Sequence, residues 1–491
     1  MRRIITTLIL GLGVCLSLQA QHKASVYLTQ QLNSSGHLKG AFVGVHVINA
    51  STGEVLVSHN GDKRFVTAST LKTLSTGAAL LSLGPDYRFA TTIAYDGEIT
   101  PDGVLEGNIY IVGGADPSLG SKKKFACNLQ ETYRQWLSSI RAAGIRKVAG
   151  CVIGDDRFYS SPMEHPSWQW YDLGTYYGAG CSALTFHENK RDFNVSPGKA
   201  VGDPVNFNLV YPPLYGLDID FQATTGEENS GNQLYLISTT LSPRAEFRGT
   251  YALGRWTKTE ETANKFPAQT IAADFSQFLS NNGIQCIYPP RDVRNSFHEF
   301  EQPYGITPQD DLHKLTTTFS PTVKTLAMET LHASNNVFAD NFLRYIGRVN
   351  ACDDSYSASL KAEEQVFKDH LGIDFGANRI EDGSGLSRQD QVSPEFFCSY
   401  LAAMKNSPVY SDFLECLSAQ GYGSLADMTY FNDTYTIYAK SGSMSGVRCY
   451  VGYIVPNSGD EDTLCFAVMV NSFSCPSSRI RTFIFNFLTS F

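Results

Sequence analysis

A serine and a lysine three positions apart open an apolar segment near the start of the chain. In TASTLKTLSTGAALLSLG (67–84), Ser69 precedes Lys72 by three residues, and residues at this spacing share one face of a helix. A helix start is an unusual place for a lysine, because the macrodipole favours cations at the other end. A lysine in a low-dielectric site can instead act as a base near neutral pH and activate a serine hydroxyl, which is otherwise a weak nucleophile.

The Ser-x-x-Lys spacing occurs three times, and the surrounding sequence separates the copies. Ser121/Lys124 lies in the charge run SKKK, and Ser196/Lys199 spans the turn-forming dipeptide Pro197-Gly198. Only the copy at Ser69 opens a predicted buried helix, because apolar residues recur there at three- and four-residue spacing: Leu71, Leu74, Ala78 and Leu81. The alternative for this copy is an ordinary solvated lysine in the first turn.

A second lysine ends a predicted strand far along the chain. Lys440, Ser441 and Gly442 follow the alternating segment TYTIYA, and this is the only Lys-Ser/Thr-Gly in the sequence. A strand lysine beside a small hydroxyl residue can hold a carboxylate at a sheet edge, and the glycine lets a substrate backbone approach closely.

Ser-x-Asn is the third element, and it also occurs more than once. The copy at 280–282 precedes Gly283 and predicts a helix C-cap. The copy at 334–336 joins two predicted helices, where Ser334 and Asn336 can project into a cleft. The alternative there is an N-cap, in which Ser334 or Asn335 begins the following helix.

The elements that position these residues are of the same type at both ends of the chain. Strands are predicted at 41–60, around a turn at 51–53, and at 88–112, 147–155, 434–440, 446–455 and 463–472, with a β-rich region at 195–255. Helices are predicted at 67–84, 127–144, 268–282, 320–333, 336–349, 356–371, 394–405 and 477–491, and the chain is expected to be helical from about 307 until the last strands. We therefore expect one αβ domain built from both ends, with a large insertion between.

Composition and the N-terminus limit the possible functions. Arg2 and Arg3 precede an apolar run, Ile4 to Leu18, and Gln19-Ala20, which predicts a signal peptide (1–20) and an exported, periplasmic protein. Val14 is a poor residue before a lipid-modified Cys15, and no later apolar run could span a bilayer. Removal of two arginines leaves 37 basic and 48 acidic residues, a net charge of −11, which argues against nucleic acid as a partner.

The cysteines and histidines predict no metal site. The 11 cysteines include no Cys-x-x-Cys pair, and buried thiols are as good an interpretation as disulfides. His187-Glu188 lacks the second histidine that a zinc-binding helix needs. We assign no cofactor.

Ser-x-x-Lys, Ser-x-Asn and Lys-Ser/Thr-Gly in this order form the motif set of penicillin-binding proteins and serine β-lactamases. The sequence from about 40 to 475 resembles the class C, low-molecular-mass penicillin-binding proteins, which are D-alanyl-D-alanine carboxypeptidases/endopeptidases of the penicillin-binding protein four type. The resemblance is weakest at about 200–300. It is carried by ASTLKTLSTGAALLSLGPDYRFATTI, GNIYIVGGADPSL, SNNVFADNFLRYIG, DGSGLSRQDQVSP and AKSGSMSGVRCYVGYI.

The resemblance implies a role for each motif residue. Ser69 would be the acylated nucleophile, Lys72 its proton acceptor, and Ser334 a proton shuttle to the leaving D-alanine. Asn336 would bind the substrate backbone, and Lys440 would support the terminal carboxylate and the proton network. Ser441 would supply the hydroxyl of the Lys-Ser/Thr-Gly motif. The backbone N–H groups of Ser69 and Ser443 would form the oxyanion hole. SNN and KSG replace the SDN and KTG of many relatives but keep the reacting groups.

Two residues outside the motifs are further candidates. Asp172 in WQWYD matches the family's acidic residue that faces the amine of the stem peptide's diamino acid, and a solvated loop acid is the alternative. Arg388 in DGSGLSR (382–388) follows a glycine-rich loop and could bind a carboxylate, although such an arginine is more often a surface residue.

The family's fold is a mixed α/β, β-lactamase/transpeptidase-like domain with an antiparallel sheet flanked by helices. We expect 21–95 and 300–491 to form this domain, 96–195 and 265–299 an inserted second domain, and 196–264 a β-rich third. Peptidoglycan stem peptides would be the substrates and β-lactams covalent inhibitors. The alternatives are a β-lactamase or esterase on the same core, or a non-catalytic peptidoglycan-binding scaffold.

Overall fold

The computed structural model describes residues 23–294, 303–429, 433–459 and 462–491. The predicted signal peptide therefore lies outside the described residues. The chain divides into two units. Unit 1 contains the chain up to Ser82, Ala327–Ser334 and Glu363–Phe491, and unit 2 contains Leu83–Leu326 and Asn335–Ala362.

Unit 1 is built on an antiparallel sheet with the strand order β2-β1-β25-β24-β23-β22. The first and last parts of the chain pair directly, since β1 runs beside β25 from Phe42↔Asn471 to Asn49↔Leu464. The strands of this sheet are β1 (Phe42–Asn49), β2 (Val55–His59), β22 (Ser418–Ala419), β23 (Tyr435–Met444), β24 (Val447–Pro456) and β25 (Leu464–Asn471). The predicted pairing of the two ends of the chain is thus present.

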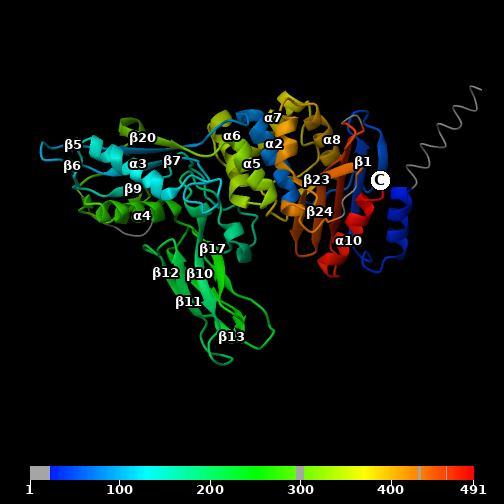
Figure 1. Cartoon of the computed structure of the whole chain (residues 1–491), viewed down its shortest axis with the longest axis horizontal. Helices are drawn as coiled ribbons and strands as arrows, with labels where there is room; N and C mark the ends of the chain where they lie inside the picture. Colours follow the sequence, from blue (N-terminus) through cyan, green and yellow to red (C-terminus); the bar gives the residue numbers. More distant parts are fainter. Residues whose placement is uncertain (1–22, 295–302, 430–432, 460–461) are drawn as a thin grey trace, which may run out of the picture. The chain divides into compact units, whose positions relative to one another are not determined.

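Helices cover both faces of this sheet (Figure 1). Val43, Val45 and Val47 of β1 share a buried core with Ile480 and Ile484 of α10 (Ser477–Leu488). The intervening residues of β1 point to the opposite face, where α8 (Pro394–Lys405) packs on β1, β24 and β25. The mixed α/β class and the helix-flanked antiparallel sheet are confirmed.

The segment carrying Ser69 differs in detail from the predicted helix. A 3₁₀ turn, η1 (Ala68–Leu71), comes first, and the α-helix α2 begins only at Lys72 and ends at Leu83. Ala68 has a left-handed φ of 46°, which costs energy for a residue with a Cβ and persists only where surrounding contacts hold it. η1 packs against β23 and β24, so tertiary contacts override the regular helix that the spacing predicts.

The remaining elements of unit 1 are short or join the two units. They are β3 (Phe65–Val66), which pairs with β21 (Gln391–Val392), α9 (Tyr410–Cys416), η6 (Gly423–Leu425), α5 (Val323–His332), which begins in unit 2, and α7 (Tyr356–Leu371), which enters from unit 2. The seven-residue helix α9 is absent from the sequence-based prediction, because so short a segment has no measurable period.

Unit 2 contains a five-stranded sheet of order β19-β9-β7-β4-β20 and a four-stranded sheet of order β18-β8-β6-β5. The core of this part joins Ile93, Ile109 and Ile111 of the sheet to Trp136 of α3 and Phe275 of α4. The elements are β4 (Ala90–Tyr95), β5 (Glu98–Ile99), β6 (Val104–Glu106), β7 (Ile109–Gly114), α3 (Leu129–Ala142), β8 (Lys147–Val148), β9 (Val152–Asp155), α4 (Pro267–Asn281), β18 (Gln285–Cys286), β19 (Arg291–Asp292), β20 (His313–Phe319) and α6 (Asn336–Ala351).

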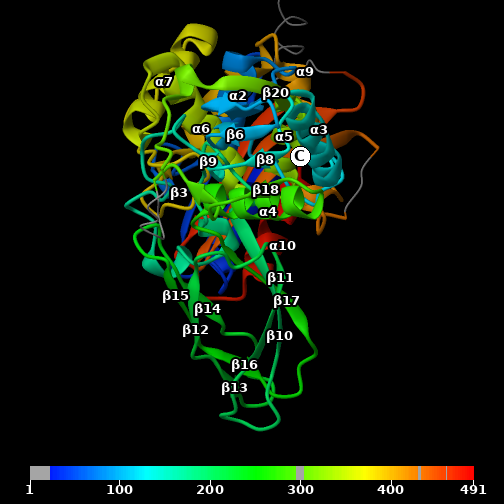
Figure 2. The ribbon, with the colours of Figure 1, turned by 90° about the vertical axis from the view of Figure 1, so that its left-hand side faces the viewer.

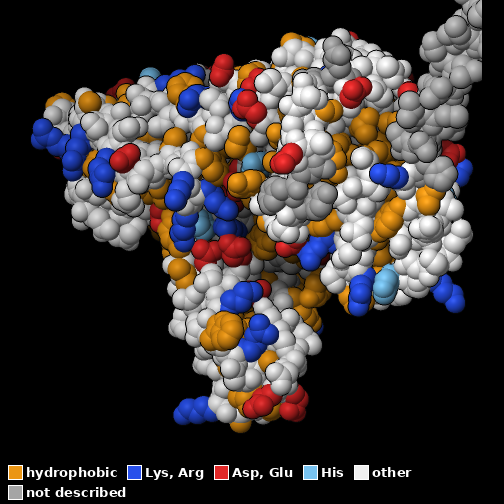
Figure 3. All heavy atoms as spheres, turned by 45° about the vertical axis from the view of Figure 1, so that its right-hand side comes forward, with side chains coloured by type: hydrophobic (Ala, Val, Ile, Leu, Met, Phe, Trp, Pro, Cys, Tyr) orange, Lys and Arg blue, Asp and Glu red, His pale blue; other side chains and the backbone are white. Residues whose placement is uncertain are grey.

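The β-rich region extends away from these layers within unit 2 (Figures 1 and 2). It contains β10 (Lys190–Ser196), β11 (Asn206–Tyr211), β12 (Asp218–Phe221), β13 (Thr224–Gly226), β14 (Tyr235–Ile237), β15 (Arg244–Arg248), β16 (Thr250–Ala252) and β17 (Lys258–Ala263). Basic and acidic side chains are intermixed on this part of the surface (Figure 3), where salt bridges join Lys190 to Glu261 and Arg248 to Glu246.

Two predictions for unit 2 are wrong. The chain is not continuously helical from about 307, because His313–Phe319 forms β20, which pairs antiparallel with β4. HKLTTTF contains few apolar residues and therefore lacks the alternation typical of a half-buried strand. The single strand expected at 147–155 is instead β8 and β9, which belong to different sheets.

Two further observations concern cysteines and membranes. No disulfide bond joins any of the ten cysteines that the described ranges include. None of the helices in those ranges is both long and apolar enough to cross a membrane.

Glu363 of α7 should make the free energy of unfolding depend on pH. Its side chain is 1% exposed, one carboxylate oxygen lacks a hydrogen-bond partner among the described residues, and burial raises its pKa to about 8. Between pH 4.5 and 8 the folded state holds a proton that the unfolded state has lost, so the wild-type free energy of unfolding falls as pH rises through this window.

Glu363→Gln should remove this dependence. We expect the variant to gain stability over wild type by on the order of 2–4 kcal/mol more at pH 8 than at pH 5, measured by urea unfolding at both pH values. Asp369→Asn, an exposed change on the same helix, should leave the wild-type dependence in place. An unchanged slope in Glu363→Gln would mean that this carboxyl is solvated.

Candidate active site

Ser69 and Lys72 lie together in unit 1. Lys72 Nζ is 3.0 Å from Ser69 Oγ, and the lysine side chain is 0% exposed at the start of α2. The solvated lysine that was the alternative interpretation is therefore wrong. A buried amine in contact with a hydroxyl can exchange a proton with it directly, which is the geometry that an activated serine needs.

The backbone of the DGSGL loop (382–386) supplies a second contact to the same amine. Lys72 Nζ donates a 2.6 Å hydrogen bond to the Ser384 carbonyl oxygen, and Ser75 Oγ donates to the carbonyl of Gly383 at 2.8 Å. The sequence predicts a loop near the cleft but gives no sign that a main-chain carbonyl contacts the lysine. The glycines and short polar side chains of this segment predict only that it is a loop.

Gly385 makes this contact possible. Its φ of +76° is left-handed, and a Cβ at this position would collide with the Ala68 carbonyl oxygen, so only glycine fits both the conformation and the space. The DGSGL loop is thereby held against the turn that carries Ser69.

Lys440 of β23 is the second buried lysine of the site. It is 0% exposed, and its Nζ donates to the Ser441 carbonyl at 2.7 Å. Burial, followed by the positive charges of Lys72 and Arg448, lowers the pKa of Lys440 well below its ordinary value. Burial and the neighbouring positive charges thus favour the neutral form of the Lys440 amine.

Gly442 brings β23 against the Ser69 turn. A Cβ on Gly442 would lie 2.6 Å from the Thr67 carbonyl oxygen and 3.1 Å from the Ser69 amide nitrogen. Any side chain here would push the strand away from Ser69. The backbone that approaches Gly442 in this structure is that of the Ser69 turn, whereas the sequence-based prediction concerned the backbone of a substrate.

Strand pairing at the outer edge of β23 ends before the motif. β22 pairs with β23 only at Tyr438 and Ala439, and beyond Ala439 no further described strand joins this edge. The Ser441 amide lies 3.5 Å from Ser424 Oγ on this outer side. Residues two apart in a strand direct their amides the same way, so the amide of the exposed Ser443 faces the same edge.

Ser334 follows α5 at the end of its segment of unit 1. It has a left-handed φ of 60°, an uncommon conformation for serine. Two residues earlier, His332 Nε2 lies 3.3 Å from the Leu417 carbonyl, so the end of α5 is fixed beside β22. The helix N-cap is Asn335, whose side chain accepts from the Phe338 amide, and Ser334 is left for another role.

Arg388 lies beside the turn that follows β23. Its guanidinium donates to the Ser445 carbonyl at 3.1 Å, in the turn between β23 and β24. This placement is compatible with a carboxylate-binding side chain as well as with a structural arginine.

Asn336 and Asp172 belong to unit 2, where both contact Tyr177. Asn336 Nδ2 donates to the Tyr177 carbonyl at 2.8 Å, and the Tyr177 hydroxyl donates to Asp172 Oδ1 at 3.2 Å. Burial, followed by the negative charge of Asp172, raises the pKa of Tyr177 to about 12. Trp170 and Tyr171 beside Asp172 are 63% and 55% exposed, so this loop presents an acid between aromatic rings.

The two other Ser-x-x-Lys copies lie in unit 2 outside any helix. Ser121 is buried and donates to the Glu188 carboxylate at 2.7 Å, whereas Lys124 is exposed. Lys199 is also exposed, after the end of β10. Neither lysine can act on its serine as Lys72 can.

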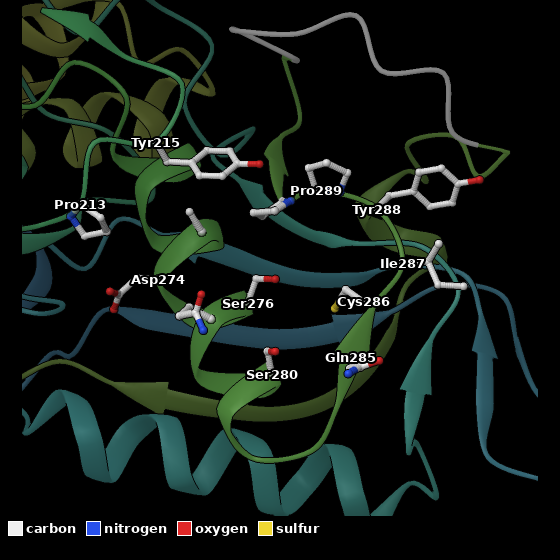
Figure 4. Close-up of a pocket in the computed structure, with 13 residues that line it drawn as sticks. Pro213, Tyr215, Asp274, Ser276, Ser280, Gln285, Cys286, Ile287, Tyr288 and Pro289 are labelled. Carbon is white, nitrogen blue, oxygen red and sulfur yellow. The ribbon is translucent and has the colours of Figure 1, made fainter.

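A pocket of about 500 Å³ in unit 2 contains none of the motif residues (Figure 4). Figure 4 shows Ser276 and Ser280 of α4 on one side and Tyr215 and Tyr288 on the other. The carboxylate of Asp274 in this pocket is already held by the Tyr133 hydroxyl at 2.9 Å, so it is not a second catalytic acid of the Ser69 site.

Comparison with known proteins identifies relatives over most of the chain. The D-Ala-D-Ala carboxypeptidase 3 (S13) family model matches residues 25–484. A D-alanyl-D-alanine carboxypeptidase from Actinomadura sp. (strain R39) is 27% identical over 455 residues, covering 90% of this chain and 79% of that protein.

Solved structures share the fold. Penicillin binding protein 4 from Haemophilus influenzae superposes with a TM-score of 0.75 at 22% identity, covering 89% of this chain and 92% of that one. Its complex with a β-lactam superposes with a TM-score of 0.71 at 20% identity, covering 91% and 95%. Because the family model spans nearly the whole chain, this protein belongs to the D-Ala-D-Ala carboxypeptidase 3 (S13) family and is a serine-type D-alanyl-D-alanine carboxypeptidase of the penicillin-binding protein four type.

Proposed function

We propose that Ser69 is the nucleophile of a D-alanyl-D-alanine carboxypeptidase/endopeptidase reaction and that Lys72 is its general base. Ser69 Oγ forms a bond to the carbonyl carbon of the penultimate D-alanine, and the bond to the terminal amine breaks. Water then hydrolyses the ester and restores the Ser69 hydroxyl. The observation that carries this proposal is the buried Lys72 amine 3.0 Å from Ser69 Oγ.

The outer edge of β23 binds the substrate backbone in this proposal. An extended peptide adds as a strand along Ser441 and Ser443, because main-chain groups at an unpaired edge can pair with it. The Ser69 and Ser443 amides form the oxyanion hole, and two donors aimed at a developing oxyanion supply several kcal/mol. The closeness of Gly442 to the Ser69 amide supports this pair.

Proton transfer to the leaving amine passes through Ser334 and the two lysines. Ser334 delivers the proton, and Lys440 supports both the substrate's terminal carboxylate and the Lys72 network. The lowered pKa of Lys440 supports its role in moving protons, because an amine whose neutral form is favoured gives up its proton more readily.

The loop of unit 2 and Arg388 recognise the rest of the stem peptide. Asn336 binds the substrate backbone, Asp172 pairs with the amine of the diamino acid, and Arg388 takes a carboxylate. The exposed Trp170 and Tyr171 support this role for Asp172, because aromatic surfaces can cover the aliphatic part of such a side chain.

Asp172→Ala tests this specificity role. Loss of a partly buried ammonium partner is worth about 1–3 kcal/mol, so hydrolysis of peptides with the free amine should slow by about ten- to a hundred-fold. D-Alanine release is measured from peptides with and without that amine, beside penicillin acylation, which should be unchanged.

The exposed unit 2 acid Asp218 provides the control, and Asp218→Ala should match wild type on all three reactions. Equal losses on all three in Asp172→Ala would mean that Asp172 supports the fold. No loss on any would leave Asp172 a solvated loop residue.

Intact-mass spectrometry after penicillin treatment tests the proposed function as a whole. A stable adduct on Ser69 together with D-alanine release from a stem peptide is the expected result. Rapid turnover of penicillin without peptide hydrolysis would indicate a β-lactamase or esterase, and absence of any adduct would indicate a scaffold.

The protein acts in the periplasm on peptidoglycan stem peptides, and β-lactams inhibit it covalently. The basic pair and apolar run of residues 1–20 support export. The insertion within the catalytic domain (96–299 in the sequence-based division) supports a peptide substrate, because a small antibiotic would not need so large an addition.

A further inference from the structure

Two buried aspartates lie at and just after the DGSGL loop that contacts the Lys72 amine. Asp382 and Asp390 are both 0% exposed, and both follow α7 in unit 1. The reaction proposed above gives neither of them a role. Buried carboxyl groups are costly unless they are fully hydrogen-bonded, so their partners indicate what they do.

Asp382 holds the main chain of the loop. Its Oδ1 accepts from the amides of Ser384 at 3.0 Å and Gly385 at 2.6 Å, and its Oδ2 accepts from the Ser387 amide at 2.8 Å. Three amides on one carboxylate fix the peptide planes on both sides of Ser384. The direction of the Ser384 carbonyl, which accepts from Lys72 Nζ at 2.6 Å, is therefore set by Asp382.

Asp390 lies beside Asp382 and keeps it in place. Its Oδ1 accepts from the Glu381 amide at 2.7 Å. Burial, followed by the negative charge of Asp382, raises the pKa of Asp390 well above its ordinary value, and Asp390 Oδ2 accepts no hydrogen bond from the described residues. A raised pKa favours the neutral carboxyl, which can donate to the neighbouring Asp382 carboxylate.

We propose that Asp382 and Asp390 form a carboxyl pair that positions Lys72 by fixing the Ser384 carbonyl that receives its amine. The inference rests on the proposed role of Lys72 as the base. Both aspartates are positioning residues, since neither contacts the substrate. A serine–amine contact is productive only over a narrow range of geometries, and a misplacement of about 1 Å can cost about a hundred-fold in rate.

The test measures penicillin acylation by stopped flow, which separates the affinity for penicillin (K) from the acylation rate constant (k2). Asp382→Asn offers one acceptor oxygen in place of two and should lower k2 by about ten- to a hundred-fold with K unchanged. A wild-type k2, or a loss confined to K, would overturn the proposal. Circular dichroism checks that the variant is folded.

Asp390 provides a second test that does not depend on the folding of Asp382→Asn. Asp390→Asn keeps a donor toward Asp382 and should acylate within about two-fold of wild type, whereas Asp390→Ala removes the donor and should lower k2 by at least about ten-fold. Equal k2 values in these two variants would overturn the pair. The matched control is Asp374→Asn, because Asp374 also accepts from a loop amide, that of Gly376 at 2.9 Å, but is exposed.

The outcomes keep the two proposals apart. If wild-type protein forms no penicillin adduct on Ser69, the proposed function is wrong. If wild-type protein is acylated and the Asp382 and Asp390 variants have the same k2 as wild type, only the positioning role is wrong.

Discussion

Ser69→Ala is expected to abolish both penicillin labelling and D-alanine release while the protein remains folded. The variant lacks the Ser69 Oγ, which lies 3.0 Å from the buried Lys72 amine, so no ester can form on this residue. The removed hydroxyl leaves only a small space in η1, and circular dichroism should match wild type. Labelling is measured by intact mass, and peptide hydrolysis by released D-alanine.

Ser196→Ala is the matched control for this variant. Ser196 also stands three residues before a lysine, but Lys199 is exposed, so labelling should proceed at the wild-type rate. A penicillin adduct in Ser69→Ala at the wild-type rate would show that the nucleophile lies elsewhere.

Lys72→Ala should be nearly as damaging as loss of the nucleophile. The Ser69 hydroxyl loses its proton acceptor, and loss of a general base typically slows a reaction by about a hundred- to ten-thousand-fold. The Ser384 carbonyl loses its partner at the same time. The acylation rate constant for penicillin and the rate of D-alanine release are measured together, because both pass through Ser69.

The two exposed lysines of the other Ser-x-x-Lys copies serve as controls. Lys124→Ala and Lys199→Ala should retain wild-type rates, since both side chains face solvent. If either proved essential while Lys72→Ala remained active, the choice among the three copies would be wrong.

Much of the fold follows from local patterns in the sequence. β24 and β25 are predicted to within one residue at each end, and β23 and α10 begin within one residue of the predicted start, because alternating and helical periods are strong there. β23 continues four residues beyond its predicted end, and α10 ends three residues before it. β20 is missed because HKLTTTF has little apolar alternation, and it is held by pairing with β4, more than 200 residues earlier. Tertiary pairing overrides weak local preference in such a segment.

The sequence by itself determined that Ser69 and Lys72 lie close together. Ser69 and Lys72 are three residues apart at the start of an apolar segment, so their proximity is a local property of the chain. The order of the three motifs and the glycine at position 442 can likewise be read directly from the sequence.

Only the tertiary structure decided how the Lys72 amine is held. The Ser384 carbonyl is 312 residues away along the chain, and β23 brings Lys440 and Gly442 to the same turn. Contacts of this kind depend on how β23 and the DGSGL loop pack against η1, which no local period encodes. The left-handed Ala68 and the late start of α2 have the same cause, because packing against β23 and β24 outweighs the preference for a regular helix.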